Sequence, residues 1–158
     1  YGDSAGGNLS AAIGLKARDD SAVGPAAQVL IYPALHYGDP LPSSEVNRFA
    51  PVLSLEAMNA CWRAYLRGAT ADAYAAPLLA DDFSGLPPAW IVTAEHDPLR
   101  DDGLLFAERL ADAGVNTKVL DVAGLVHGCF RVRHTSAVTR RAFQSSVEAV
   151  REGLGIAS

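Results

Sequence analysis

The sequence has 158 residues, of which 49% are hydrophobic, and it carries a formal net charge of −5. This composition is typical of a globular domain, and the charge argues against nucleic acid or an anionic membrane surface as a partner. No apolar run is long enough to predict a membrane span. The two cysteines, Cys61 and Cys129, have neither metal-ligand spacing nor a disulfide framework. We therefore expect free thiols, no metal site and a cytoplasmic protein, with any signal peptide left open.

The most distinctive motif lies at the start of the chain, where Gly2-Asp3-Ser4-Ala5-Gly6 fits the pattern G-x-S-x-G. This pattern is typical of a nucleophile elbow, in which a serine occupies a sharp turn between a strand and a helix. The flanking glycines, Gly2 and Gly6, relieve the crowding of the backbone there. The residues after the motif predict a helix that runs to about Arg18. Ser4 is therefore a candidate nucleophile, and the N–H of Ala5 is a candidate oxyanion donor.

Two alternatives compete with this interpretation of the motif. Short Gly-Ser clusters often form flexible turns, and a similar Gly-Asp-Ser-Gly-Gly signature occurs in chymotrypsin-like proteases. In those proteases the serine comes last among the catalytic residues, within a β-barrel of short strands. In this sequence the serine comes first and a helix follows it, which favours the elbow.

The middle of the chain is predicted to begin with a strand at 28–32, followed by a long loop at 34–52. A helix is expected at 55–66, with Ser54 as its N-cap. Another loop should cover 69–88, where prolines and small residues interrupt any periodic pattern.

Two further predicted strands are each followed by a residue that could assist a nucleophilic serine. Residues 90–94 form an apolar, β-branched run typical of a buried parallel strand, and Asp97 follows this run. A second strand is expected at 119–122, with His127 in the loop after it. Parallel sheets place their chemistry at the carboxyl ends of the strands. The order serine, aspartate, histidine is that of the α/β-hydrolases.

The remaining elements are helices at 103–113, ended by Gly114, and at 135–152, ended by Gly153. Strands and helices thus alternate along the chain. This alternation predicts the α/β class, with a mostly parallel sheet flanked by helices on right-handed crossovers.

Together these motifs resemble the bacterial hormone-sensitive-lipase-like carboxylesterases, in their Gly-Asp-Ser-Ala-Gly subgroup. The resemblance rests on residues 2–9, on Ala76-Pro77-Leu78, on Glu95-His96-Asp97-Pro98-Leu99-Arg100-Asp101-Asp102-Gly103 and on Val126-His127-Gly128. It implies an α/β-hydrolase fold and a serine carboxylesterase that acts on small-molecule esters with short to medium acyl chains. In that family Ser4 would be the nucleophile, Asp97 the orienting acid and His127 the base, with no metal or organic cofactor. Cys129 stands where the family commonly has an aromatic residue.

The resemblance also implies parts that these residues do not contain. The family carries an N-terminal cap, the first strands of the sheet and a His-Gly-Gly-Gly-type loop that donates further N–H groups to the oxyanion. We therefore expect residues 1–158 to form the C-terminal part of a single catalytic domain, and to be inactive by themselves. The strand at 28–32 should then expose an unpaired edge and make the isolated chain poorly soluble.

Several residues keep two interpretations. Met58 and Trp62 share one face of the helix at 55–66 and could line the acyl pocket, with Val126 near the base, or could be ordinary core. Glu95 could brace the loop of Asp97 or lie exposed. The last strand could join two copies as a homodimer. Two other functions stay open: a hydrolase of amides or peptides, and a non-catalytic binding protein on this fold, which the presence of His127 disfavours.

Overall fold

The computed structural model describes residues 1–156, in which strands and helices alternate. In chain order the elements are β1 (Gly2–Asp3), α1 (Ala5–Asp19), β2 (Gln28–Ile31), α2 (Pro42–Val46), α3 (Leu55–Leu66), the 3-10 helix η1 (Pro77–Leu79), β3 (Ala89–His96), α4 (Arg100–Asp112), β4 (Thr117–Val126), the 3-10 helix η2 (Cys129–Val132) and α5 (Ala137–Gly153). Among these residues, no helix has both the length and the apolar character needed to cross a bilayer.

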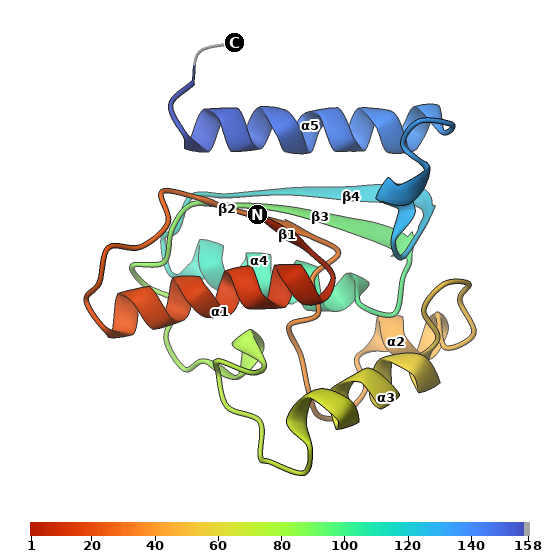
Figure 1. Ribbon diagram of the computed structural model, residues 1–158, viewed down its shortest axis with the longest axis horizontal. Coiled ribbons are helices and arrows are strands. Elements are labelled where there is room, and N and C mark those ends of the chain that lie inside the picture. The colour runs from red at the N-terminus through yellow and green to blue at the C-terminus, as the bar shows by residue number, and fades with distance from the viewer. Residues whose placement is uncertain (157–158) are drawn as a thin grey trace.

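The strands form one sheet in the order β1-β2-β3-β4, and every neighbouring pair is parallel. Helix α5 covers one face of the sheet, while α1 and α4 cover the other (Figure 1). Helices α2 and α3 lie farther from α5, toward the end of the molecule where β3 and β4 finish (Figure 1). The predicted α/β class, with a parallel sheet between helices, is therefore confirmed.

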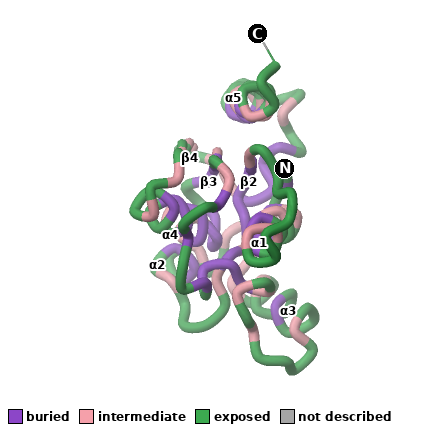
Figure 2. Tube along the Cα trace, turned by 90° about the vertical axis from the view of Figure 1, so that its left-hand side faces the viewer, coloured by how far each residue is buried: buried purple, intermediate pink, exposed green. Residues whose placement is uncertain are grey.

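The core consists of two apolar clusters, one on each face of the sheet. Successive residues of a strand point to opposite faces, so Leu30 packs toward α1 and α4 while Val29 packs toward α5. The first cluster includes Leu15, Leu30, Ile91, Phe106 and Leu110, and the second includes Val29, Ile31, Val92, Phe130 and Ala149. Burial is concentrated in the strands and in the inner sides of the helices (Figure 2). Because helices cover both faces of the sheet, the central strands β2 and β3 are mostly apolar along their length and do not alternate between apolar and polar residues.

The edge of the sheet differs from the expectation. Gly2 and Asp3 form β1 and pair with Leu30 and Ile31, so β2 has a partner on both sides there. The short β1 therefore covers the edge of β2 at Leu30 and Ile31, while Gln28 and Val29 have no partner in β1. A two-residue strand leaves no periodic pattern that a sequence could show.

The bounds of several helices and strands also differ from those predicted from the sequence. Helix α4 begins at Arg100, three residues before the predicted start, and β4 continues to Val126. Helix α2 lies inside the segment predicted as a loop, and α5 includes Gly153. The strand was underestimated because β4 lies at the edge of the sheet, where several side chains are exposed and the apolar pattern is weak.

Candidate active site

Ser4 occupies the turn between β1 and α1. Its backbone has φ 55° and ψ −119°, a region that non-glycine residues rarely adopt. The N–H of Ser4 donates to the carbonyl oxygen of Ile31 at 2.9 Å, so the strained turn is anchored on β2. Such strain is typical of turns that expose a reactive side chain.

The glycines around Ser4 have different roles from those the motif predicted. A Cβ at Gly2 would lie 2.1 Å from the carbonyl oxygen of Gly6, so Gly2 must be glycine, as expected. A Cβ at Gly6 would meet nothing within 4 Å. A Cβ at Gly7 would lie 2.7 Å from the Cβ of Pro33, so the close approach is at Gly7. The prediction that Gly6 relieves crowding of the backbone was therefore wrong. The close approach at Gly7 was missed because Pro33 belongs to a distant segment of the chain.

Ser4, His127 and Asp97 are brought together from three separate segments. The Oγ of Ser4 lies 2.9 Å from Nε2 of His127, and Nδ1 of His127 lies 2.7 Å from Oδ2 of Asp97. Asp97 is completely buried and His127 is 8% exposed. The three polar groups thus form a continuous hydrogen-bond chain at the carboxyl ends of β1, β3 and β4, where they were expected to meet.

The carboxyl group of Asp97 is held by backbone as well as by His127. Its Oδ1 accepts a hydrogen bond from the N–H of Leu99 at 2.9 Å. Asn47, which caps the end of α2, donates from Nδ2 to the carbonyl oxygen of Asp97 at 3.3 Å. Asn47 carries no local signal in the sequence, because its contact with Asp97 joins segments that are far apart along the chain.

The ring of His127 packs edge-on against Tyr32, with 4.9 Å between the ring centroids. Tyr32 in turn contacts Phe130, whose ring lies 5.7 Å away. Burial raises the pKa of the Tyr32 hydroxyl well above its usual range, so this ring acts as a neutral wall. The sequence predicts Tyr32 only as the end of the strand at 28–32.

Asn8, in the first turns of α1, ties the helix to two loops. It is 4% exposed, and its Nδ2 donates to the carbonyl oxygens of Ala34 and Ala75, both at 2.8 Å. These bonds join the start of α1 to the segments after β2 and before η1. Ala5 is the first residue of α1, so its N–H has no acceptor within the helix and lies at the positive end of the helix dipole.

A cavity of about 320 Å³ opens beside Ser4. It is bordered on one side by a single face of α3, formed by Met58, Cys61, Trp62 and Tyr65. The remaining lining residues are Ser4, Ala5, Asn8, Leu9, Ala34, Leu53 and Leu99. A wall of this composition suits an apolar ligand group next to the serine hydroxyl.

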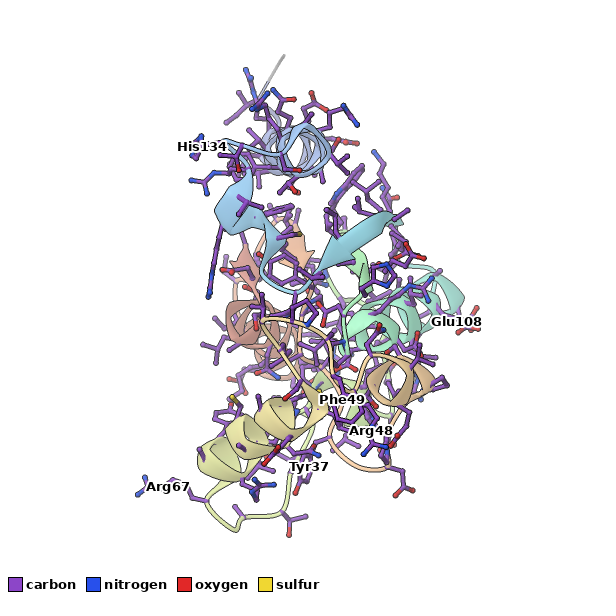
Figure 3. All side chains as sticks on the ribbon, turned by 90° about the vertical axis from the view of Figure 1, so that its right-hand side faces the viewer. Tyr37, Arg48, Phe49, Arg67, Glu108 and His134 are labelled. Carbon is purple, nitrogen blue, oxygen red and sulfur yellow. The ribbon has the colours of Figure 1, made fainter. Side chains whose placement is uncertain are left out.

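Trp62 is the most buried residue on that face of α3, with 6% of its surface exposed. Its ring lies 5.4 Å from the ring of Tyr37 and 6.0 Å from that of Tyr65. Tyr37 lies beside α3 in the view onto the strand ends (Figure 3). Val126, the third candidate for the pocket, is not among the residues that line this cavity. It is the last residue of β4 and lies opposite His96.

The two cysteines are both free thiols, with Cys61 exposed and Cys129 buried. Burial raises the pKa of the Cys129 thiol to about 11, which disfavours the thiolate that a cysteine nucleophile needs. Within residues 1–156, no three His, Cys, Asp or Glu side chains gather as a metal site.

Comparison with known proteins identifies the family. Residues 1–131 match the family described as "alpha/beta hydrolase fold". The chain belongs to this family. Its relatives also support the resemblance to the hormone-sensitive-lipase-like carboxylesterases, because several are named as esterases or as ester hydrolases.

Three relatives illustrate the similarity of this α/β-hydrolase chain. Carboxylesterase NlhH of Mycobacterium tuberculosis is 43% identical over an alignment of 133 positions, gaps included, which covers 80% of this chain and 41% of that protein. Arylacetamide deacetylase of Bos taurus is 31% identical over an alignment of 204 positions, gaps included, which covers 90% of this chain and 51% of that protein. The crystal structure of the carboxylesterase EstE1, cloned from a metagenomic library, has a TM-score of 0.89 and 38% identity, covering 97% of this chain and 53% of that one. The chain therefore spans roughly half the length of these relatives, or less.

Proposed function

We propose that the protein containing this chain is a serine carboxylesterase that cleaves small esters with short to medium acyl chains. The observation that carries the proposal is the hydrogen-bond chain from Ser4 through His127 to the buried Asp97, beside an apolar cavity. The names of the relatives agree with it. Because the relatives are about twice as long, we further propose that residues 1–158 are the C-terminal part of one catalytic domain.

The proposed first half of the reaction uses the two hydrogen bonds of His127. His127 accepts the proton of Ser4 at Nε2 as Oγ attacks the ester carbonyl carbon, and Asp97 stabilises the resulting imidazolium through Nδ1–H. The carbonyl oxygen becomes an oxyanion, and we propose that the N–H of Ala5, at the start of α1, donates to it. Collapse of this intermediate breaks the bond to the alcohol oxygen, which takes the proton from His127.

The second half regenerates the serine. A water molecule gives a proton to Nε2 of His127 and attacks the acyl group carried on Oγ of Ser4. The carboxylic acid leaves, and the proton returns to Ser4. We propose that the acyl chain lies against Met58 and Trp62 in the cavity beside Ser4. No step requires a metal ion or an organic cofactor.

The test is hydrolysis of p-nitrophenyl acetate and butyrate by a longer protein that contains this chain. We expect Ser4→Ala and His127→Ala each to reduce kcat by at least about 10⁴-fold. We expect the 158 residues alone to show no turnover, because losing a single oxyanion donor already costs about 10²–10³ in kcat. Full activity of either variant would contradict the assignment. Turnover by the chain alone that Ser4→Ala abolishes would contradict only the expected inactivity.

A second candidate reaction is the cleavage of amides, since one relative is named arylacetamide deacetylase. The same serine, histidine and aspartate serve both reactions, so the rates on matched p-nitrophenyl acetate and p-nitroacetanilide separate them. A non-catalytic binding protein is distinguished by its failure to react with a fluorophosphonate at Ser4.

We also propose that the protein is cytoplasmic and that the outer edge of β4 can join two copies into a homodimer. Strand β4 has one neighbour, β3, and Val119 on it is 44% exposed. Val119→Lys should then shift the protein from dimer to monomer in sedimentation experiments. A monomeric unmodified protein would rule out the dimer.

A further inference from the structure

The strands that precede Asp97 and His127 do not pair in a constant register. From Ala89 to Ala94, β3 pairs residue by residue with β4, and Ala94 lies opposite Val122. The next pair is His96 with Val126, so β3 advances by two residues while β4 advances by four. The extra residues form a bulge in β4, directly before His127.

This bulge decides which residue of β4 lies level with Asp97. If the register of Ala94 and Val122 continued, Leu125 would lie opposite Asp97. His127 would then be displaced by two residues, which is about 6.6 Å along a parallel strand. The observed hydrogen bond between His127 and Asp97 is 2.7 Å long, and a displacement of that size would break it. The bulge is therefore required for the contact between the acid and the base.

Glu95 closes this bulge. It is the one residue of β3 between the pairs on either side of the irregularity, and its Oε2 accepts a hydrogen bond from the N–H of Gly124 at 2.7 Å. Gly124 lies in the bulge with φ +71°, a conformation that favours glycine. A carboxylate that accepts from a backbone N–H makes a short, charge-assisted bond. The same carboxylate lies 3.8 Å from Nε2 of His96, which is exposed.

We propose that Glu95 is a positioning residue that holds the bulge of β4 at Gly124 and thereby keeps His127 level with Asp97. Glu95 lies two residues before Asp97 and Gly124 lies three residues before His127. Their hydrogen bond therefore joins the two segments that carry the acid and the base, close to both. The inference rests on the proposed function for its catalytic consequence, but the geometric claim stands apart from turnover.

The first test reads the geometry without catalysis. In ¹H NMR, the Nδ1 proton of a histidine bonded to a buried carboxylate gives a low-field signal, and exchange with water broadens it when the bond loosens. We expect Glu95→Ala to broaden or remove the His127 signal. Glu95→Gln keeps an acceptor oxygen and should keep the signal. Glu108→Ala is the matched control, since Glu108 is exposed and projects outward from α4 (Figure 3).

The second test uses the reaction of Ser4 with a fluorophosphonate in the longer protein. We expect Glu95→Ala to slow this labelling up to about 100-fold, as for a misplacement near 1 Å, while Glu95→Gln and Glu108→Ala react at the original rate. Gly124→Ala should act like Glu95→Ala, since a Cβ there meets no atom within 4 Å and only the positive φ is unfavourable. Combining the two changes should cost little more than either alone.

The outcomes separate the two proposals. If the unmodified longer protein is not labelled at Ser4, the proposed function fails, while the NMR signal still tests the role of Glu95. If folded Glu95→Ala keeps the signal and the labelling rate, the positioning role is overturned. If Glu95→Ala does not fold, Glu95→Gln and Gly124→Ala decide. Loss of the signal in Gly124→Ala with retention in Glu95→Gln supports the role, and any other combination overturns it.

Discussion

At the scale of single residues, the elbow around Ser4 depends on which neighbours approach the backbone. Gly2 faces the carbonyl group of Gly6 from within the motif, whereas Gly7 faces Pro33, which follows β2. The first contact is local and was predictable from the pattern G-x-S-x-G. The second contact needs the fold, because Pro33 reaches α1 only when β2 pairs with β1.

We predict that substitutions at the two glycines of the motif have very different effects on stability. Gly2→Ala should lower the free energy of unfolding by about 3 kcal/mol or more, because its Cβ would overlap the backbone carbonyl group of Gly6, which the helix holds in place. Gly6→Ala should change stability by no more than about 1 kcal/mol, since its Cβ meets no atom within 4 Å outside the adjacent residues and the backbone of its own helix, and alanine favours a helix. Thermal unfolding of both variants checks this. Equal melting temperatures would contradict it.

Asp102 is a buried carboxyl group with two backbone donors. Its Oδ2 accepts hydrogen bonds from the N–H groups of Leu35 and His36, both at 2.8 Å. Burial nevertheless raises its pKa to about 7, because the desolvation of the charged form outweighs the two hydrogen bonds. The folded protein therefore keeps this proton to a higher pH than the unfolded chain does. The associated stability is present below about pH 4 and is lost as the pH rises toward 7.

We predict that Asp102→Asn removes this pH dependence, because an amide keeps an acceptor oxygen for the same donors and does not titrate. The free energy of unfolding of the variant, minus that of the unmodified chain, should increase from about pH 4 to about pH 7 by on the order of a few kcal/mol. It should then level off. Urea denaturation of both proteins at several pH values measures this difference. The contributions of the other titrating groups are the same in both proteins and cancel in the difference. A difference that is constant with pH would contradict the prediction.

At the scale of elements, α3 is a helix whose bounds and N-cap were predicted from its local sequence. Its bounds at Leu55–Leu66 agree with the prediction, and the Oγ of Ser54 accepts from the N–H of Ala57 as an N-cap should. The start of α4 was predicted at Gly103, with Asp101 and Asp102 at its first turn, and the helix begins three residues earlier, at Arg100. Asp101 and Asp102 accept hydrogen bonds from distant backbone, at Ser43 and at Leu35 and His36.

Since α3 forms a wall of the cavity, we predict that it limits the length of the acyl chain. Trp62→Ala in the longer protein should raise the ratio of kcat/KM for a longer-chain ester to that for the acetate by at least about tenfold, because it removes the most buried part of the wall. Trp62→Leu should give a smaller change in the same direction. Arg63→Ala, on an exposed part of α3, is the control. An unchanged ratio in both Trp62 variants would show that α3 does not set the chain length.

At the scale of the whole molecule, the sheet has two open edges, one at β1 and one at β4. Close to the β1 edge, α1 exposes Leu9 by 54% and Ile13 by 61%. An open parallel edge beside exposed apolar side chains favours association with another chain. The two active-site strands β3 and β4, by contrast, are joined along most of their length and are tied by the bond between Glu95 and Gly124.

We predict that the 158 residues alone self-associate through the β1 edge. Sedimentation should show larger species as the concentration rises, and Ile13→Lys should reduce them. Val23→Lys is the control, because Val23 is fully exposed in the loop after α1. A monodisperse monomer with cooperative melting would count against the prediction. An N-terminal fragment of the longer protein should restore solubility in trans.

The sequence by itself determined the alternation of most strands and helices, the parallel sheet and the three residues that meet at its carboxyl edge. These follow from local signals: apolar runs, caps, the elbow motif around Ser4, and the strands that precede Asp97 and His127. Only the tertiary structure decided the contacts between segments that are far apart along the chain. The bulge that brings His127 level with Asp97, the contact of Gly7 with Pro33 and the bond from Asn47 to the Asp97 loop all join parts of the chain that have no shared local pattern. Their positions depend on packing, which is settled when the sheet and its helices come together.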